Sequence, residues 1–368
     1  MKIVHISPDL HTGGAQRFCV DICNELAKNK KNRVVLCSLE KMNDRQMIMY
    51  KSINPNVKFI SLNKETNHPK IIWHIFKMLW REKPDITHTH LRAQFFAALP
   101  LIFFNKPNIH TIHSVAQKET PAMRRKLYKI LYNLFKFTPV AISDMVLRSM
   151  KEEYGEKYDI KIENGARPLK TTSDYKNVQK YIESLKQTSD TKIFVSIGRL
   201  FPVKNQGLLI DAFEMLLAQG YDAHLLIIGS YEVIPEFTQT CKAKIKTPQK
   251  IHLLGEKENV ADFLTEADFL CFSSLYEGMP ITVLEAFSLG VPTISTPVGG
   301  MPDIIKNSKT GFLAKDMSPE SYCNVLKRAF EDKSIDKSKL KQLYESKYTM
   351  KLCAENYSKL YAQKLANK

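Results

Sequence analysis

The feature that most constrains the fold of this chain is an alternation of short apolar segments with longer segments of helical periodicity. The apolar segments are rich in β-branched residues, and between them apolar side chains recur three or four positions apart. The segments expected to form strands are residues 2–8, 33–39, 57–62, 85–90, 108–114, 139–143, 192–200, 223–230, 250–256, 269–274 and 291–296. Strands that alternate with helices favour a parallel sheet covered by helices on both faces.

A polar stretch divides this alternation into two halves. Residues 165–190 read GARPLKTTSDYKNVQKYIESLKQTSD, and the alternation resumes at residue 192. A length of 368 residues is also typical of two domains. We therefore expect an α/β protein with two doubly wound, Rossmann-like domains facing each other across a cleft. The expected domains are residues 1–166 and 189–345, with a linker at 167–188.

Three further segments carry structural expectations. A helix is expected around residues 69–82, and residues 93–104 (AQFFAALPLIFF) are expected to form a core helix followed by a strand. Residues 349–366 are expected to form the last helix, which could pack on either domain. Its apolar stripe consists of Leu352, Tyr357, Leu360 and Tyr361.

Several targeting features are missing from the sequence. The first residues, MKIVHISPDL, lack the apolar stretch and cleavage site of a signal peptide. No apolar segment reaches the ~20 residues that span a bilayer. The seven cysteines are scattered without metal-ligand spacing, which is typical of reduced thiols in a cytosolic protein.

The positive charge of the chain is concentrated in its first half. Residues 1–170 contain 29 Lys+Arg and 15 Asp+Glu, a net charge of +14, whereas residues 171–368 contain 25 and 23, a net charge of +2. Such an asymmetry predicts that one half meets an anionic partner. Anionic membrane and nucleic acid both remain open at this point.

Two acidic residues, Glu277 and Glu285, stand in an otherwise apolar segment, SSLYEGMPITVLEAFSLGVPTIST at 273–296. Pro280 suits the first position of a helix that Gly290 would end. Glu277 would then lie in the loop between strand and helix, and Glu285 about one and a half turns into the helix.

The start of this helix offers a site for an anion. Free N–H groups at a helix start favour negative charge, and Gly278 lets the backbone approach a ligand closely. Phosphates at the helix start and hydroxyls at the two carboxylates would together suit a sugar nucleotide. The alternative is a buried glutamate paired with a core lysine or histidine.

Two glycine-containing loops provide further candidate ligands. In SIGRLFPVKNQG (196–207), Gly198 opens a loop from which Arg199 and Lys204 could neutralise a diphosphate. The alternative is an ordinary solvated loop. In HTGGAQR (11–17), Gly13 and Gly14 allow close approach to a phosphate, although the dinucleotide pattern G-x-G-x-x-G is missing.

Four histidines, His88, His90, His110 and His113, cluster at the ends of two predicted strands. His113 would point to the cleft if its strand ends there. The alternatives are core histidines, above all His88 and His110, or a metal cluster. A metal is not expected, because no carboxylate pair or cysteine stands near them in the sequence, and the chain has no Asp-x-Asp pair.

Taken together, these motifs resemble those of the retaining GT-B glycosyltransferases of family 4 (glycosyl transferases group 1). The Glu-x7-Glu segment with its flanks is the specific part of the resemblance, and the other matches follow in order along nearly the whole chain. The matching segments are residues 13–16, 85–90, 111–113, 141–143, 164–165, 196–206, 225–229, 253–255, 277–300 and 311–313.

The resemblance implies roles for individual residues. Arg199 and Lys204 would hold the donor diphosphate. Glu277 would hydrogen-bond the donor sugar, assisted by the N–H groups of Gly278 and Met279. Glu285 would bind the ribose hydroxyls.

Further roles follow from the same resemblance. Gly13 and Gly14 would approach the diphosphate from the first domain, and His113 would face the sugar at its reacting end. The terminal helix, residues 346–368, would pack back on the first domain. The remaining predicted substrate-binding residues are Gln16, Gly198, Ser230, Gly255 and Pro280.

The sequence departs from the family pattern at two places. Ser230 stands where a second glycine is usual after the strand, and Arg167 stands where an acidic residue is common near the hinge.

The expected function is therefore metal-independent, retaining transfer of a sugar from a nucleotide-sugar donor, without a cofactor. The donor is expected to be a UDP-sugar rather than a GDP-sugar, and the acceptor a glycan or lipid-linked molecule in bacterial-type surface polysaccharide or glycolipid assembly. The alternatives are another GT-B reaction on a sugar nucleotide, such as epimerisation or hydrolysis, and nucleic-acid binding. No recognised nucleic-acid motif accompanies the basic residues, so nucleic acid is not expected as a partner.

The segment QKETPAMRRKLYKILYNLFKF (117–137) bears on location. Its basic residues and its apolar residues, Leu127, Tyr128, Leu131, Leu134 and Phe135, fit a helix at an anionic membrane surface. The alternative is a core helix with a solvated basic side. We expect a cytoplasmic protein, attached peripherally to the inner face of the membrane.

Overall fold

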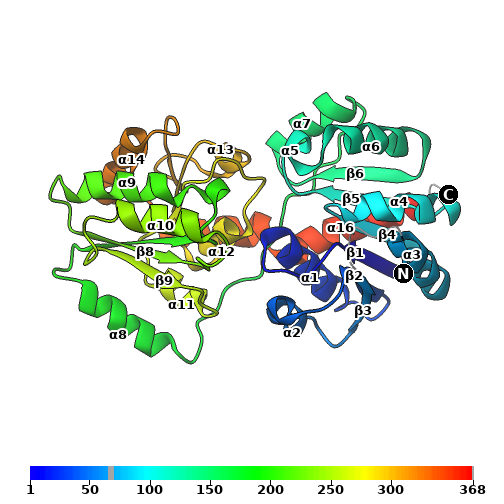
Figure 1. The fold of residues 1–368 in the computed structure, drawn as a ribbon, viewed down its shortest axis with the longest axis horizontal. Helices are drawn as coiled ribbons and strands as arrows, with labels where there is room; N and C mark the ends of the chain where they lie inside the picture. Colours follow the sequence, from blue (N-terminus) through cyan, green and yellow to red (C-terminus); the bar gives the residue numbers. More distant parts are fainter. Residues whose placement is uncertain (65–69, 367–368) are drawn as a thin grey trace. The chain divides into compact units, whose positions relative to one another are not determined.

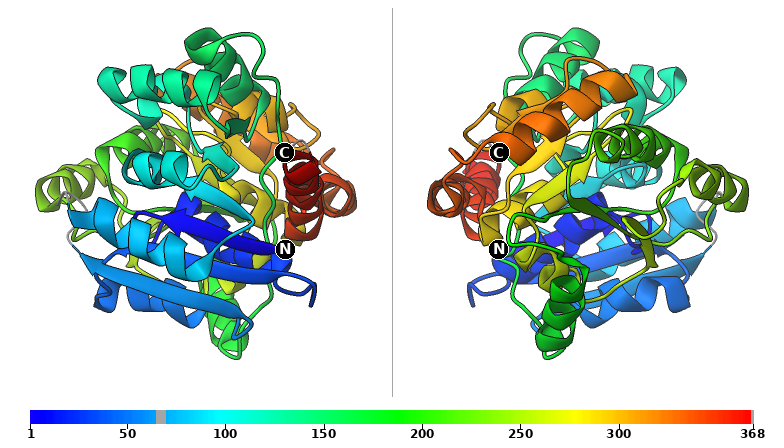
Figure 2. Two further views of the ribbon diagram at one scale, coloured as in Figure 1. Left: turned by 90° about the vertical axis from the view of Figure 1, so that its right-hand side faces the viewer. Right: turned by 90° about the vertical axis from the view of Figure 1, so that its left-hand side faces the viewer.

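The computed structural model describes residues 1–64 and 70–366, and the chain divides into two compact units. Unit 1 comprises Met1–Arg167 and Lys347–Lys368, and unit 2 comprises Pro168–Ser346. Each unit contains one six-stranded sheet with helices on both faces (Figures 1 and 2). All paired strands within these sheets are parallel, which confirms the expected α/β architecture.

The sheet of unit 1 has the strand order β3-β2-β1-β4-β5-β6. Its strands are β1 (Lys2–Ser7), β2 (Arg33–Glu40), β3 (Val57–Lys64), β4 (Ile86–His90), β5 (Asn108–Ile112) and β6 (Phe137–Ala141). Its helices are α1 (Gly14–Leu26), α2 (Met47–Lys51), α3 (Lys70–Glu82), α4 (Ala93–Phe103), α5 (Ala116–Glu119), α6 (Ala122–Leu134), α7 (Asp144–Tyr154) and α16 (Met350–Ala366). The strand order reverses between β1 and β4, the position at which doubly wound sheets bind ligands.

The terminal helix α16 belongs to unit 1, where it packs against α1. It buries Tyr357 and Tyr361, and the Tyr361 hydroxyl lies 2.6 Å from Nδ1 of His88 on β4. The Tyr357 hydroxyl lies 2.7 Å from Oγ1 of Thr111 on β5. The apolar stripe therefore covers the centre of the sheet. The expected ends of two helices, residue 69 and residues 367–368, lie outside the described residues.

The sheet of unit 2 has the strand order β12-β11-β10-β7-β8-β9. Its strands are β7 (Lys192–Ile197), β8 (Ala223–Ile228), β9 (Ile251–Gly255), β10 (Phe269–Phe272), β11 (Thr293–Ser295) and β12 (Gly311–Leu313). Its helices are α8 (Tyr175–Leu185), α9 (Gln206–Leu217), α10 (Pro235–Lys244), α11 (Val260–Thr265), α12 (Ile281–Leu289), α13 (Met301–Ile304), α14 (Pro319–Glu331) and α15 (Lys337–Leu343). The order reverses between β7 and β10.

The segment expected to be a linker contains a helix. Residues 175–185 form α8, which packs against α11 and buries Val178 and Ile182. These two side chains stand four residues apart and therefore share one face of the helix. The polar residues around them hid this short apolar stripe. Strand β12 has only three residues and was not expected.

Two other expectations need correction. Residues 93–103 form one helix, α4, with Pro100 inside it and no following strand. The basic segment 117–137 does not form one continuous helix. It is divided between α5, α6 and the start of β6, and α6 buries Tyr128 and Leu131 in the core of unit 1. Among the described residues, no helix combines the length and apolar character needed to cross a bilayer.

Candidate functional site

The reversal of strand order in unit 2 brings two predicted site residues together. Lys204 lies in the loop after β7 and Glu277 in the loop after β10, and these neighbouring parallel strands end at the same edge of the sheet. The Lys204 ammonium Nζ lies 2.5 Å from the Glu277 carboxylate oxygen Oε1. Both side chains are partly buried. The pair places one cation and one carboxylate at the ligand-binding edge of the sheet.

The backbone around Lys204 is fixed by the neighbouring loop. Residues Pro202–Lys204 form a short 3-10 turn. The Ser273 hydroxyl donates a hydrogen bond of 2.8 Å to the Lys204 carbonyl, and the Leu275 N–H donates one of 2.8 Å to the Val203 carbonyl. The two loops therefore form one connected structure, and the position of Lys204 does not depend on its ion pair alone.

Glu277 is held by contacts that sequence reasoning missed. The Ser274 hydroxyl donates a hydrogen bond of 2.7 Å to Glu277 Oε1. Gly299 has a φ of +56°, and a Cβ built there would lie 1.6 Å from the Glu277 carbonyl oxygen. The Gly300 N–H donates a hydrogen bond of 2.8 Å to the Gly278 carbonyl. The glycine pair in TPVGG was the only sequence signal for this close packing.

Helix α12 begins directly after this loop. Pro280 is extended and precedes the helix, so the helix starts at Ile281, one residue later than expected. Glu285 lies on the second turn and is half-buried, whereas the Met279 side chain is buried in the protein. Gly290 ends the helix with a φ of +78°, as its position in the sequence predicted.

Arg199 is exposed, but its backbone is fixed. The buried side chain of Gln206 donates a hydrogen bond of 2.9 Å from Nε2 to the Arg199 carbonyl. The Leu200 N–H donates a hydrogen bond of 2.9 Å to the Ser230 carbonyl in the next loop. Within the described part of the chain, no ion pair involves the Arg199 guanidinium.

Three glycines lie where the loops after β7, β8 and β9 meet. The Gly198 N–H donates to the Ile228 carbonyl, and the Gly229 N–H donates to the Gly255 carbonyl. A Cβ on Gly229 would lie 2.1 Å from the Gly198 carbonyl oxygen. Gly229, which was not among the predicted site residues, is therefore required by the crossing of two backbones.

In unit 1, Gly13 and Gly14 lie at the start of α1, after β1. Gly13 is extended, and a Cβ on Gly14 would meet no atom within 4 Å. The protein itself therefore gives no steric reason for glycine at position 14. Gln16 on the first turn of α1 donates a hydrogen bond of 2.8 Å from Nε2 to the Asp9 carboxylate.

His113 follows β5 and is the first member of a chain of imidazoles. Its Nε2 lies 3.1 Å from Nδ1 of His90, and Nε2 of His90 lies 3.1 Å from Nδ1 of His5. Burial lowers the pKa of His113 to about 4 and the pKa of His5 to about 3. Burial, together with the neighbouring imidazoles, also lowers the pKa of His90. These rings are therefore neutral at pH 7.

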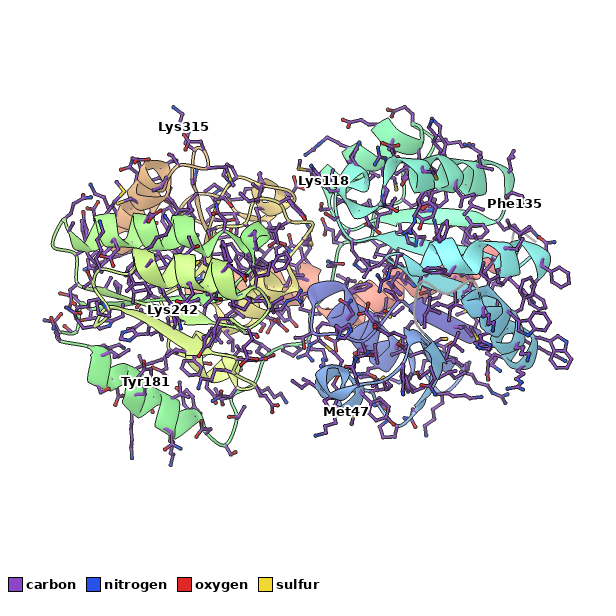
Figure 3. The ribbon with its side chains drawn as sticks, in the orientation of Figure 1. Met47, Lys118, Phe135, Tyr181, Lys242 and Lys315 are labelled. Atoms are coloured by element: carbon purple, nitrogen blue, oxygen red, sulfur yellow. The ribbon has the colours of Figure 1, made fainter. Side chains whose placement is uncertain are left out.

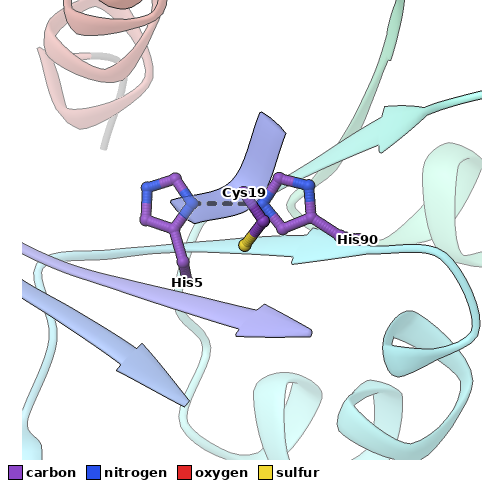
Figure 4. A group of neighbouring side chains, drawn as sticks. All are labelled: His5, Cys19 and His90. Carbon is purple, nitrogen blue, oxygen red and sulfur yellow. Dashed lines mark hydrogen bonds between the residues drawn. The ribbon is translucent and has the colours of Figure 1, made fainter. Parts of the chain in front are cut away.

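The fold brings Cys19 of α1 next to His5 and His90 (Figure 4). Cys19 is distant from these histidines in the sequence and lies beside them because α1 packs over the sheet. All three residues are buried, and the two imidazoles already share a hydrogen bond. A second group, Asp9, His11 and Glu40, includes an ion pair of 3.2 Å between His11 and Glu40. Each group therefore contains one interaction between its own members.

The predicted site residues thus form one set in each unit. The unit 2 set occupies loops after β7 to β10 and the start of α12, and the unit 1 set follows β1 and β5.

His88 and His110 are buried polar residues of the sheet, as the alternative interpretation held. Arg167 ends unit 1, and its Nε lies 2.7 Å from the carboxylate of the buried residue Asp21 on α1.

Comparison with known proteins gives matches along both units. The family described as Glycosyltransferase Family 4 matches residues 12–163, and the family described as Glycosyl transferases group 1 matches residues 177–350. A similar curated protein is the UDP-Gal:alpha-D-GlcNAc-diphosphoundecaprenol alpha-1,3-galactosyltransferase of Escherichia coli. It is 26% identical over 298 residues, which cover 75% of this chain and 73% of the relative.

Solved structures show the same fold. A glycosyltransferase from Rickettsia africae ESF-5 superposes with a TM-score of 0.83 at 21% identity, covering 100% of this chain and 99% of the other. Anabaena Alr3699/HepE, solved in complex with UDP-glucose, superposes with a TM-score of 0.82 at 16% identity, covering 100% of both chains. These likenesses, together with the two parallel sheets, confirm the expected GT-B fold.

Proposed function

The chain belongs to the family 4 glycosyltransferases of the GT-B fold, and from this membership we propose how its loops bind and activate a donor. The enzyme transfers a sugar from a nucleotide-sugar donor in the assembly of a glycan or a lipid-linked glycan. The observation that carries the proposal is the Lys204–Glu277 pair at the β7/β10 edge of unit 2. It supplies a cation for phosphate and a carboxylate for hydroxyls.

In the proposed complex, the donor diphosphate replaces Glu277 as the partner of Lys204. Arg199, whose backbone is anchored by Gln206, adds a second cation. Glu277 stays beside the sugar because Ser274 and the turn at Gly299 hold it independently of Lys204. Its carboxylate then accepts hydrogen bonds from sugar hydroxyls, and Glu285 accepts those of the ribose.

The chemistry requires stabilisation of the leaving nucleoside diphosphate. Negative charge grows on its phosphates as the glycosidic bond breaks, and preorganised cations stabilise that charge. Arg199, Lys204 and the start of α12 supply this stabilisation in our proposal, without a metal ion. We propose retention of configuration, with the acceptor hydroxyl attacking the face from which the diphosphate departs and a phosphate oxygen taking the proton.

Unit 1 also carries residues that would suit a sugar nucleotide in this proposal. The open space at Gly14 supports close approach of the diphosphate. His113 is neutral at pH 7, so it can hydrogen-bond a sugar hydroxyl without placing a positive charge beside the reacting carbon. The hydrogen bond to His90 fixes the orientation of its ring.

The proposed donor is a UDP-sugar and the proposed acceptor is lipid-linked. A structural neighbour was solved with UDP-glucose, and the E. coli relative is named for UDP-Gal and a diphosphoundecaprenol acceptor. A lipid-linked acceptor would place the enzyme at the inner face of the cytoplasmic membrane. Nothing in this proposal requires nucleic acid.

The proposal can be tested by incubating the purified protein with a panel of UDP- and GDP-sugars, with and without polyprenyl-diphosphate glycan acceptors. We expect nucleoside diphosphate release that depends on the acceptor, together with a product that is heavier by one sugar. Equal release without acceptor would indicate hydrolysis, and a changed sugar without release would indicate epimerisation. Either result would overturn the assignment as a transferase.

A further inference from the structure

Three helices of unit 1 end at the amino edge of its sheet, opposite the loops that follow β1 and β5. In a doubly wound sheet, each helix runs back from the carboxyl ends of the strands to their amino ends. Helix α3 ends just before β4, α4 just before β5, and α6 just before β6. Their last turns therefore meet at the amino edge of the sheet, on the side of unit 1 where the amino terminus also lies (Figure 1).

Each of these last turns exposes a large apolar side chain. Trp80 on α3 is 66% exposed, Phe103 on α4 is 71% exposed and Leu134 on α6 is 73% exposed. Phe135 follows α6 and is also exposed, beside the start of β6 (Figure 3). We call these four residues the amino-edge rim. Large apolar side chains gathered on one face of a protein mark an interaction surface.

The apolar surface continues from the rim along α3 and α4. The ring centroids of Phe76 and Phe103 lie 5.3 Å apart, and those of Trp73 and Phe76 lie 6.4 Å apart. Trp73 is exposed, as is Leu99 on α4. The two helices therefore share one exposed face with aromatic and aliphatic side chains, beyond the four residues of the rim.

Basic side chains lie beside this face. Residues 70–136 contain 12 Lys+Arg and three Asp+Glu, a net charge of +9. Arg81 and Lys136 directly follow apolar residues of the rim, and Lys106 stands three residues after Phe103. The described residues give none of the three an ion-pair partner. Of the three acidic residues, Glu82 is buried and pairs with Lys2 and Lys58. The exposed acidic residue Asp85 lies at this edge directly before β4, and Arg81, Lys106 and Lys136 outnumber it.

A hollow of about 390 Å³ adjoins the rim at the start of β6. Phe135 and Lys136 contribute to its wall, so the rim and the hollow are continuous. Lys157 and Lys364 bring two further ammonium groups, and Tyr132 and Tyr158 bring aromatic rings. Cations beside apolar walls match a lipid whose anionic headgroup lies next to its acyl chains.

We propose that the amino-edge rim is the surface by which this protein docks on an anionic bilayer, with the lysine-lined hollow receiving lipid headgroups. Tryptophan and phenylalanine enter the interfacial layer, while arginine and lysine contact the phosphates. A second copy of this chain is a poor occupant, because pairing two such faces would bring like charges together. Nucleic acid, whose bases could stack on the aromatic rings of the rim, is the alternative occupant that the RNA arm of the test distinguishes.

The inference rests on the proposed function in one respect: a lipid-linked acceptor is the reason for such an enzyme to reach a bilayer. The proposed docking surface differs from the one expected from the sequence, which was a single helix over residues 117–137. The apolar face of α6 packs into the core of unit 1 and is not available to a membrane. The docking surface consists instead of the ends of three helices.

The two tryptophans of the chain, Trp73 and Trp80, both lie on α3 and report on docking. The full-length protein would be mixed with vesicles of phosphatidylcholine alone or of phosphatidylcholine with phosphatidylglycerol. We expect co-sedimentation with the anionic vesicles, a blue shift of tryptophan emission, and quenching by brominated acyl chains. Added salt should weaken the binding.

The double variants Phe103→Ser/Leu134→Ser and Lys106→Glu/Lys136→Glu should each weaken vesicle binding about tenfold or more. Their side chains project from the protein, so melting temperatures should stay near wild type. Matched controls away from the rim are Ile48→Ser on α2 and Lys176→Glu/Lys180→Glu on α8, which should bind vesicles like wild type. Lys157→Glu should weaken binding selectively for anionic vesicles.

Several results would overturn the proposal. They are failure of the wild type to bind anionic vesicles, wild-type binding by both rim variants, or binding to an RNA oligonucleotide in place of vesicles. The vesicle measurements themselves do not use turnover, and a separate transfer assay distinguishes the two proposals. Failure of the wild type to bind anionic vesicles, with intact sugar transfer to a short-chain soluble acceptor, would refute the docking surface alone, whereas intact vesicle binding without any transfer would refute the proposed function alone.

Discussion

Lys204 and Glu277 form an ion pair across the point where the strand order of unit 2 reverses. The pair explains why an apolar segment of the sequence contains an acidic residue. Its carboxylate is held by the Ser274 hydroxyl and its backbone by the turn at Gly299. A carboxylate supported in this way keeps its position when a phosphate takes over its lysine partner.

The first prediction concerns Arg199. Arg199→Ala should lower turnover by about two orders of magnitude, because one preorganised charge that stabilises the leaving diphosphate is lost. Since the side chain is exposed and the loop is held through its backbone, the melting temperature should not change. Steady-state kinetics with saturating donor measure the effect. Lys192→Ala, on β7 of the same unit, provides a lysine control outside the site, and near-normal turnover of Arg199→Ala would remove Arg199 from the site.

The second prediction separates two glycines. Gly299→Ala should destabilise the protein by about 2 kcal/mol or more, because a Cβ would overlap the Glu277 carbonyl at an unfavourable positive φ. Gly14→Ala should leave stability unchanged but weaken donor binding, because its Cβ would occupy space left for the ligand. Urea unfolding and donor titration of both variants test this. Unchanged donor affinity in Gly14→Ala would show that the diphosphate does not approach there.

A third prediction is metal independence. The chain has no Asp-x-Asp pair, and Arg199 and Lys204 are proposed to stabilise the leaving group. Sugar transfer should therefore persist in excess EDTA. Complete loss of activity that manganese or magnesium restores would reveal a cation site among the substrate-binding groups.

The fourth prediction concerns acid stability. Burial lowers the pKa of His5 to about 3 and holds the pKa values of His88 and His90 well below their ordinary value. In the unfolded chain these imidazoles take up protons near pH 6.5, whereas in the folded chain they stay neutral. Unfolding therefore binds protons below pH 6.5, and the free energy of unfolding falls as the pH falls, by roughly 1 kcal/mol per pH unit for each imidazole.

Urea unfolding followed by circular dichroism at pH 7.5, 6.5 and 5.5 measures this effect. We expect little change between the first two values and a clear fall at the third. Equal unfolding midpoints at pH 7.5 and 5.5 would contradict the buried, neutral state of the histidines.

Much of the fold follows from local sequence patterns. Alternating apolar strands and helices indicate two doubly wound sheets, and Gly290 marks a helix end because few other residues adopt its positive φ. Helix α8 escaped prediction because its two buried side chains, Val178 and Ile182, stand in a polar segment. Such a stripe becomes apparent only when the neighbouring helix that covers it is known.

The contacts within the candidate site could not be read in the same way. The sequence identified Lys204 and Glu277 separately, but their ion pair joins residues far apart in the chain and depends on the strand order. Gly299 was overlooked because its role is to make room for a carbonyl of another loop. Cys19 lies beside His5 and His90 only because α1 packs over the sheet.

The most direct test of the account is calorimetric titration of UDP into wild type, Lys204→Ala, Glu277→Gln and Glu285→Gln. Lys204→Ala and Glu285→Gln should each weaken UDP binding about tenfold or more, because each loses a charged contact to the nucleotide. Glu277→Gln should bind UDP as well as wild type or better, because UDP has no sugar and the variant frees Lys204 from its ion pair. If Glu277→Gln instead loses UDP affinity as severely as Lys204→Ala, the pair supports the loop as a structural unit and the proposed division between phosphate and sugar is wrong.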